Sequence, residues 1–234
     1  MINSVSNALA AALIAASLFA AAPVSAADPQ SAPAPTLKVG DRWVYNVTSG
    51  IGLSKTTYQE TREVTAVDAS GIKVKVTGKT SEGKDFTRVD ELASPGEVRY
   101  GSPCVDEPYR FHTPLQRVTF PIVPGERSSK WVDVVAEPSG TKGQFNYYFT
   151  TRNWEKQTVP AGSFDAIRVD VLMMLDDATA FRNATTCNFI YWYSPAVKNT
   201  VRERRTAMYT THLSPTDTEV LNANYELASF TPGK

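Results

Sequence analysis

The chain has 234 residues, of which 42% are hydrophobic and 10% aromatic, and its 24 basic and 24 acidic residues give a formal net charge of zero. This hydrophobic content is sufficient for a packed core, so intrinsic disorder is not expected. The balanced charge argues against nucleic-acid binding, which requires a basic surface that replaces counterions. It also argues against strong electrostatic capture by anionic lipid surfaces.

The N-terminal segment has the pattern of an export signal. Residues 8–22 form an uncharged run rich in Ala, Leu and Ile, and Val24 and Ala26 supply the small residues of a signal-peptidase site. The run is shorter than the roughly 20 residues that span a bilayer. Because residues 1–7 lack the usual Lys or Arg, a membrane anchor or an incorrectly assigned start codon is the alternative. We predict an N-terminal signal helix that is cleaved after Ala26 or Ala27.

This signal predicts a periplasmic or secreted protein. No Cys follows the apolar run, so lipid attachment at the cleavage site is not expected. No later segment approaches a membrane-spanning length, and no transmembrane segment is expected in the mature chain.

A linker and one β domain are predicted after the signal peptide of residues 1–26. Residues 27–36 are rich in Pro and polar side chains, which favours an extended and mobile linker. Apolar and polar residues then alternate with a period of two, for example over residues 72–76, which indicates β-strands. We assign residues 37–232 to a single β domain.

Turn residues separate the predicted strands. Asp68–Gly71 and Val159–Ser163 contain Asp, Pro and Gly at positions suited to hairpin turns. Ser194–Asn199 predicts a third reversal, in which Asn199 is the residue best able to adopt a left-handed conformation.

The remaining segments differ in character. Residues 88–92 are predicted to form a short helical turn. Residues 96–114, which contain three prolines, are predicted to be the longest irregular stretch. Two long strands, over residues 200–213 and 218–230, are expected to complete the sheet.

Two parts of the sequence resemble each other. The sequence Gly40–Val44 is echoed by Gly125–Arg127 and Trp131–Val132, which suggests an internal duplication, although alternating β sequences also resemble one another by chance. The predicted fold is mostly β, an antiparallel meander that forms a curved open sheet, a half-barrel or a sandwich, with two similar halves if the duplication is real.

The two cysteines predict a disulfide. Cys104 and Cys187 are the only cysteines and are separated by 83 positions. An even pair in an exported chain favours a bridge over two separate thiols. No metal site or cofactor is predicted, because two lone cysteines with His112 and His212 lack any ligand spacing.

Aromatic residues on the predicted strands are the candidate ligand-binding groups. Exposed aromatic platforms can stack on sugars or line an apolar pocket. The alternative is that these rings simply fill a β-sheet core. The candidates share alternating positions on three strands and are Trp43, Tyr45, Tyr147, Phe149, Tyr191 and Tyr193.

No catalytic constellation is recognised in the sequence. Nucleophile-elbow and zinc-protease motifs are absent, and nothing local orients either histidine. Asp176–Asp177 could pair with Glu155 or Asp170 as acid and base for glycoside hydrolysis, although adjacent aspartates are more often a solvated turn. We therefore predict a protein without enzymatic activity and no catalytic residues.

Residues 202–205, Arg-Glu-Arg-Arg, lie on a predicted long strand. This cluster could bind an anionic partner. Cations on an exposed edge strand, where they discourage aggregation between sheets, explain it equally well.

Three motifs together resemble a known group of proteins. The sequences GDRWVY at Gly40–Tyr45, VPAGSFDAI at Val159–Ile167 and YWYSPAV at Tyr191–Val197 resemble bacterial exported β-rich proteins of unknown function, the TapB-like proteins. The resemblance implies a β-rich exported protein and supplies no ligand and no functional residues.

These observations favour an exported, non-catalytic envelope protein that acts as a binding or assembly module. Its partner would be an apolar or glycan ligand or another envelope protein, of unknown identity. One alternative is a periplasmic carrier that holds a lipid or other apolar ligand in a concave β-sheet. A polysaccharide-acting hydrolase is a further alternative.

Overall fold

The computed structural model describes most of the chain after the predicted signal peptide. The described residues are 30–51, 54–80, 82–104, 108–137, 139–176, 185–211 and 214–234. The predicted signal peptide therefore lies outside them. None of the helices in this part of the chain has the length and apolar character needed to cross a membrane.

The described residues form twelve strands and one short 3-10 helix. In chain order the elements are β1 (Arg42–Ile51), β2 (Thr56–Asp68), β3 (Gly71–Lys79), β4 (Asp85–Ser94), β5 (Glu97–Gly101), β6 (Tyr109–Gln116), β7 (Arg127–Ala136), β8 (Lys142–Val159), β9 (Gly162–Asp176), β10 (Thr185–Ser194), η1 (Pro195–Val197), β11 (Asn199–Thr211) and β12 (Ser214–Thr231).

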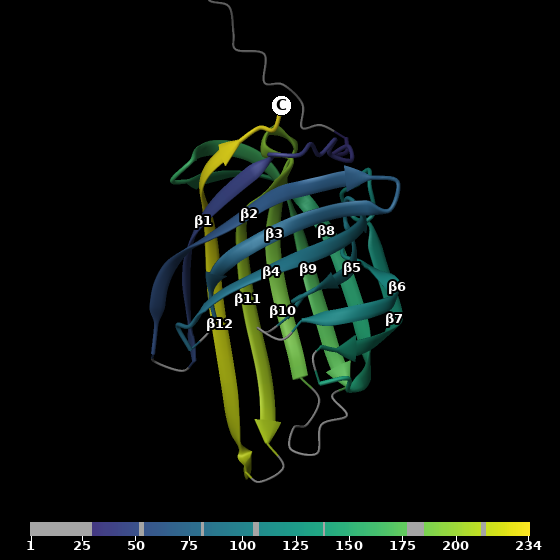
Figure 1. The fold of residues 1–234 in the computed structure, drawn as a ribbon, viewed down its shortest axis with the longest axis vertical. Coiled ribbons are helices and arrows are strands. Elements are labelled where there is room, and N and C mark those ends of the chain that lie inside the picture. Colours follow the sequence, from purple (N-terminus) through teal and green to yellow (C-terminus); the bar gives the residue numbers. More distant parts are fainter. Residues whose placement is uncertain are drawn as a thin grey trace, which may run out of the picture.

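The strands close into one antiparallel barrel (Figure 1). Each strand pairs with its neighbours in sequence, and β1 pairs with β12 from Arg42↔Thr231 to Ile51↔Leu221. The prediction of a mostly β, antiparallel meander is confirmed. The predicted open sheet, half-barrel or sandwich is wrong, because alternation specifies the buried face of a strand but not whether the first and last strands pair.

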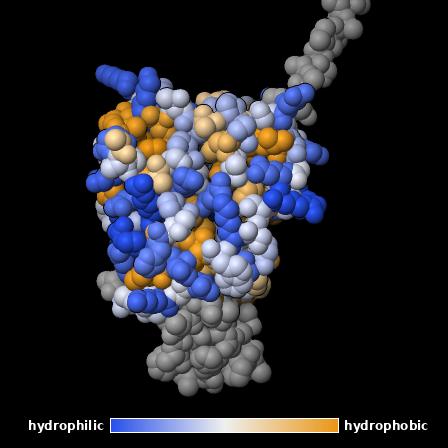
Figure 2. All heavy atoms as spheres, turned by 90° about the vertical axis from the view of Figure 1, so that its right-hand side faces the viewer, coloured by the Kyte–Doolittle hydropathy of each residue, from blue (hydrophilic) through white to orange (hydrophobic). Residues whose placement is uncertain are grey.

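Closure makes the inner face of the barrel its core. Alternate residues of β9, for example, point inward, and Ile167, Val169 and Val171 are buried. The outer face is largely polar. Figure 2 shows hydrophilic side chains with separate hydrophobic patches on the side that carries β6 and β7.

The predicted hairpins between β2 and β3 and between β8 and β9 are confirmed. The third reversal is also present, but its left-handed residue is Lys198, with φ of 58°, and not Asn199. This conformation places the Lys198 ammonium 3.0 Å from both carboxylate oxygens of Asp41. The ion pair offsets the small backbone cost of a left-handed non-glycine residue.

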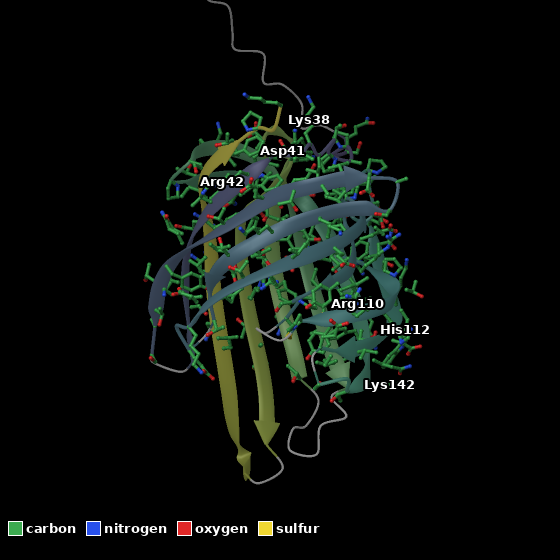
Figure 3. All side chains as sticks on the ribbon, viewed as in Figure 1. Lys38, Asp41, Arg42, Arg110, His112 and Lys142 are labelled. Carbon is green, nitrogen blue, oxygen red and sulfur yellow. A yellow bond between two sulfur atoms is a disulfide. The ribbon has the colours of Figure 1, made fainter. Side chains whose placement is uncertain are left out.

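Asp41 joins three segments at the end of the barrel where β1 begins (Figure 3). Its buried carboxylate accepts hydrogen bonds from the backbone N–H groups of Lys38 and Gly233, each at 2.8 Å, and from Lys198. Burial alone would raise the pKa of Asp41, but these donors together lower it. The start of β1, the C-terminal tail and the turn before β11 are therefore held together.

Three local predictions are wrong. Residues 88–92 belong to strand β4, and residues 96–114 contain β5 and part of β6, because neighbouring strands on both sides supply partners for their backbone groups. Residues 30–36 of the predicted mobile linker are docked on the barrel. Ala32 is fully buried and pairs with Ile122 in an isolated antiparallel bridge.

The repeated Gly-acid motif forms the same turn twice. Gly40–Asp41 exchanges two backbone hydrogen bonds with Val64 on β2, at 2.8 and 2.9 Å. Gly125–Glu126 makes the same two bonds with Thr151 on β8, at 3.1 and 2.9 Å. The two glycines adopt φ of 88° and 87°, which favours glycine at both positions. Equivalent turns thus precede β1 and β7, while duplication of the gene remains a prediction.

The predicted disulfide is confirmed. Cys104, which follows β5, is bonded to Cys187 on β10, with their Cα atoms 5.9 Å apart. Both residues are buried. Since β5 and β10 are not neighbours in the sheet, the bridge ties two sides of the barrel together through its interior.

Removing this bridge is expected to destabilise the barrel strongly. A Cys104→Ala/Cys187→Ala variant should lose about 4–5 kcal/mol of unfolding free energy, because the bond closes a loop of 83 positions in the unfolded chain. Urea unfolding with and without reductant measures this effect. Reductant should weaken the wild type and leave the variant unchanged. Equal stability of the oxidised and reduced wild type would contradict the assignment.

Candidate functional site: a cavity at one end of the barrel

A cavity of about 130 Å³ lies at the end of the barrel that carries Asp41, because Leu37 and Lys198 are part of its wall. Figure 3 labels Lys38 and Asp41 at this end. Its wall is contributed by the strap of residues 35–37, by strands β1 to β5, β10 and β11, by the turn before β11, and by the segment that follows β6. Most of this wall is apolar or aromatic and includes Leu37, Trp43, Leu92, Val98, Phe120 and Tyr193.

Hydrogen bonds fix the aromatic rings of the wall. The Trp43 indole N–H donates to the carbonyl oxygen of Val197 at 2.7 Å. The Tyr193 hydroxyl donates to the carbonyl oxygen of Pro33 at 3.3 Å, and its ring packs edge-on against Phe120 at 5.3 Å between centroids. The ring polar groups are therefore satisfied by protein, and the ring surfaces are left to line the cavity.

A group of ionised side chains lies in the lumen at the inner end of the cavity. We call it the luminal ion cluster, and it consists of Glu60, Arg62, Arg117, Glu203 and Arg205. Glu203 is completely buried and is the centre of the cluster. Its carboxylate lies 2.6 Å from Arg205, 3.6 Å from Arg117 and 3.8 Å from Arg62. Arg62 is also paired with Glu60 at 2.7 Å.

Tyrosine rings surround the cluster. The Arg62 guanidinium lies over the rings of Tyr45 and Tyr225, at 4.6 and 5.4 Å from their centroids. Arg205 lies 4.8 Å from the centroid of Tyr225. Burial raises the pKa of Tyr45 to about 12, which keeps this ring neutral at physiological pH. Neutral rings with electron-rich faces therefore stabilise the buried cations without adding charge.

The arginines keep Glu203 ionised. Burial alone would raise the pKa of this carboxyl, but Arg205, Arg117 and Arg62 lower it from 4.5 to about 2. One carboxylate oxygen, Oε2, accepts no hydrogen bond from the described residues. The cluster is therefore held by charge attraction more than by complete hydrogen bonding.

All six predicted aromatic site residues are buried on the inner face of the barrel. Three of them, Trp43, Tyr191 and Tyr193, line the cavity. The other three, Tyr45, Tyr147 and Phe149, are not part of its wall and pack in the lumen. Their role in ligand binding remains a prediction.

The sequence analysis named Glu203 and Arg205 within residues 202–205, but it did not place them in the lumen and did not identify Glu60, Arg62 or Arg117. Glu60 and Arg62 are in phase with the buried Val64 on β2, and Glu203 and Arg205 are in phase with the buried Val201 on β11. This alternation was visible in the sequence. It places polar residues on the face that apolar neighbours bury.

Residues 202–205 divide between the two faces of β11. Glu203 and Arg205 belong to the luminal ion cluster, whereas Arg202 pairs with Glu226 at 2.9 Å and Arg204 is exposed. Trp192 on β10 lies close to Arg204, 5.7 Å from its guanidinium. The edge-strand interpretation is wrong, because β11 pairs with β10 on one side and β12 on the other.

The structure describes two of the four carboxylates that were proposed as acid and base. Glu155 accepts a hydrogen bond from the indole of Trp192 at 2.7 Å, and Asp170 is paired with Arg152 and Arg168 at 2.8 and 2.7 Å. Asp177 and the side chain of Asp176 lie outside the described residues.

Of the two histidines, only His112 lies within the described residues. His112 is exposed on the outer side of β6 (Figure 3), and His212 lies outside the described ranges. In the same ranges, no three His, Cys, Asp or Glu side chains are grouped as a metal site.

Comparison with solved structures shows a shared fold. The barrel is similar to that of a predicted lipoprotein from Parabacteroides distasonis, with a TM-score of 0.51 and 16% identity over 87% of this chain and 100% of that chain. A predicted exported protein with a YmcC-like fold from Bacteroides fragilis gives a TM-score of 0.48, with 14% identity over 86% and 99% of the two chains.

The hypothetical lipoprotein YmcC from Escherichia coli gives a TM-score of 0.41, with 6% identity over 82% of this chain and 85% of that chain. No protein-family model and no curated protein sequence matches this chain. At 16% identity, the likeness to the Parabacteroides distasonis protein concerns the fold alone.

Replacing the central carboxylate is expected to destabilise the barrel. Glu203→Gln leaves three arginines with Glu60 as the one remaining carboxylate of the cluster, so the unfolding free energy should fall by about 3–5 kcal/mol at pH 7. Urea unfolding measures the loss. The matched control is Glu226→Gln, which removes a partly exposed partner of Arg202 and should cost at most about 1 kcal/mol.

The same carboxylate predicts a pH dependence. Because folding lowers the pKa of Glu203 to about 2, its stabilisation is present above the unfolded value and is lost as pH falls toward 2. Wild type should therefore lose more stability than Glu203→Gln between about pH 4.5 and pH 2. Parallel pH profiles of the two proteins would contradict this role.

Proposed function

We propose that this chain is an exported, non-catalytic binding protein that holds an apolar molecule in the cavity at the end of its barrel. The observation that carries the proposal is the cavity itself, whose wall is mostly apolar and aromatic, beside two hydrophobic clusters of buried side chains. Protein interiors rarely leave space larger than a water molecule without a reason.

The size of the cavity supports a small or partly enclosed ligand. Its volume of about 130 Å³ is near the ~150 Å³ of an engineered apolar cavity that admits a benzene ring. One ring or a short alkyl segment therefore fits inside, with the rest of the molecule in the opening. The side chains that such a segment would contact include Trp43, Val98 and Tyr193.

Three observations support export. The apolar N-terminal run resembles a signal peptide, and the Cys104–Cys187 bridge suits an oxidising compartment. The Parabacteroides distasonis protein with the same fold is described as a lipoprotein, which is an envelope protein. Resemblance to TapB-like proteins, assembly with an envelope partner and glycan binding remain predictions.

The neutral fluorescent probe N-phenyl-1-naphthylamine tests the binding function. The protein should bind one probe saturably, and Val98→Phe should weaken binding at least tenfold, because the larger ring occupies the cavity. Val67→Phe, on the exposed outer side of β2, is the matched control and should bind as wild type does.

Circular dichroism shows whether each variant is folded. Probe binding that is equal in the two variants, or no probe binding by wild type, would contradict the proposal.

Export is tested separately. The intact mass of the protein recovered from the envelope shows whether the chain is cleaved after Ala26 or Ala27.

A further inference from the structure

We infer that the ligand of the cavity is an amphiphile with one negative charge, and that its anionic group binds Arg117. The inference rests on the proposed function, because it concerns the same cavity. It adds the chemical class of the ligand and the residue that selects it.

Of the three arginines in the luminal ion cluster, Arg117 has the most unused hydrogen-bond donors. Arg62 donates a hydrogen bond to Glu60 at 2.7 Å, and Arg205 donates one to Glu203 at 2.6 Å. The Arg117 guanidinium donates none to the described residues, and its closest carboxylate oxygen belongs to Glu203 at 3.6 Å. Its side chain is 30% exposed and lines the cavity. A guanidinium presents five N–H donors in a planar fork that matches a carboxylate or sulfonate.

The net charge around the cavity would be balanced by one bound anion. The cluster contains three arginines and two glutamates, so its members carry one excess positive charge. Lys198 is the other cation in the cavity wall, and both oxygens of Asp41 neutralise it. An uncompensated buried charge is unfavourable, and a singly charged anion at Arg117 would balance the excess.

A second polar side chain with unused hydrogen-bonding capacity lines the same cavity. Thr200 is buried, and its hydroxyl has no hydrogen-bond partner among the described residues. A buried hydroxyl without a partner is costly, and here it can donate to the anionic group that Arg117 binds. The apolar part of the ligand would then contact the rings of Trp43 and Tyr193. A ligand with an anionic end that binds Arg117 and an apolar part that contacts this wall is an amphiphile.

Two probes that share one ring system test this inference. N-phenyl-1-naphthylamine is neutral, and 8-anilinonaphthalene-1-sulfonate adds a single sulfonate to the same rings. Wild type should bind the sulfonate at least tenfold more tightly than the neutral probe, and added salt should reduce this preference. Arg117→Gln should weaken sulfonate binding at least tenfold and change binding of the neutral probe by less than twofold.

Matched variants separate binding from folding. Arg127→Gln removes an exposed arginine at the start of β7 and should leave both affinities unchanged. Thr200→Val keeps the side-chain shape, and it should weaken sulfonate binding several-fold without affecting the neutral probe. If Arg117→Gln does not fold, the sulfonate affinity of Thr200→Val tests the inference in its place.

The outcomes distinguish the two proposals. Equal affinity of wild type for the two probes, or sulfonate binding that is unchanged in both Arg117→Gln and Thr200→Val, would overturn the anionic ligand and leave the binding function intact. Failure of wild type to bind either probe would overturn both.

Discussion

The pairing of β1 with β12 is the constraint on which the rest of the structure depends. It removes both edges of the sheet, so that one face of every strand becomes an enclosed interior. In an open sheet Glu203 would face water, and its arginine partners would be ordinary surface residues. Asp41 reinforces the closure, because it binds the start of β1, the C-terminal tail and the turn before β11.

The enclosed interior is divided by the luminal ion cluster. Glu203 and its three arginines occupy space that apolar side chains would otherwise fill. The tyrosine rings around them stabilise the buried cations through cation–π contacts. A cavity of about 20 Å³ lies beside Cys104 of the disulfide, whereas the cavity at the end of the barrel that carries Asp41 is about 130 Å³. The charges thus lie between a packed region and an accessible one, where they can meet the polar end of a bound molecule.

Much of the fold was predictable because strand alternation and turn chemistry are local. Residues 72–76 and 167–171, the hairpin at Asp68–Gly71 and the Cys104–Cys187 bridge all followed from nearby residues or from composition. Barrel closure was not predictable, since it depends on a register between the two ends of the chain. The ion cluster was not predicted because residues 202–205 were interpreted as one group on a strand, although Glu203 alternates in phase with buried neighbours. Docking of residues 30–36 depends on the barrel surface that receives them.

The closed barrel thus keeps an accessible cavity beside buried charge. A crystal structure of the protein grown with decanoate would show whether a ligand occupies that cavity. We expect the carboxylate within hydrogen-bond distance of the Arg117 guanidinium and the Thr200 hydroxyl, with the alkyl chain against Trp43 and Tyr193. Side chains that fill the cavity, or decanoate bound on the outer surface while the cavity is empty, would contradict the account.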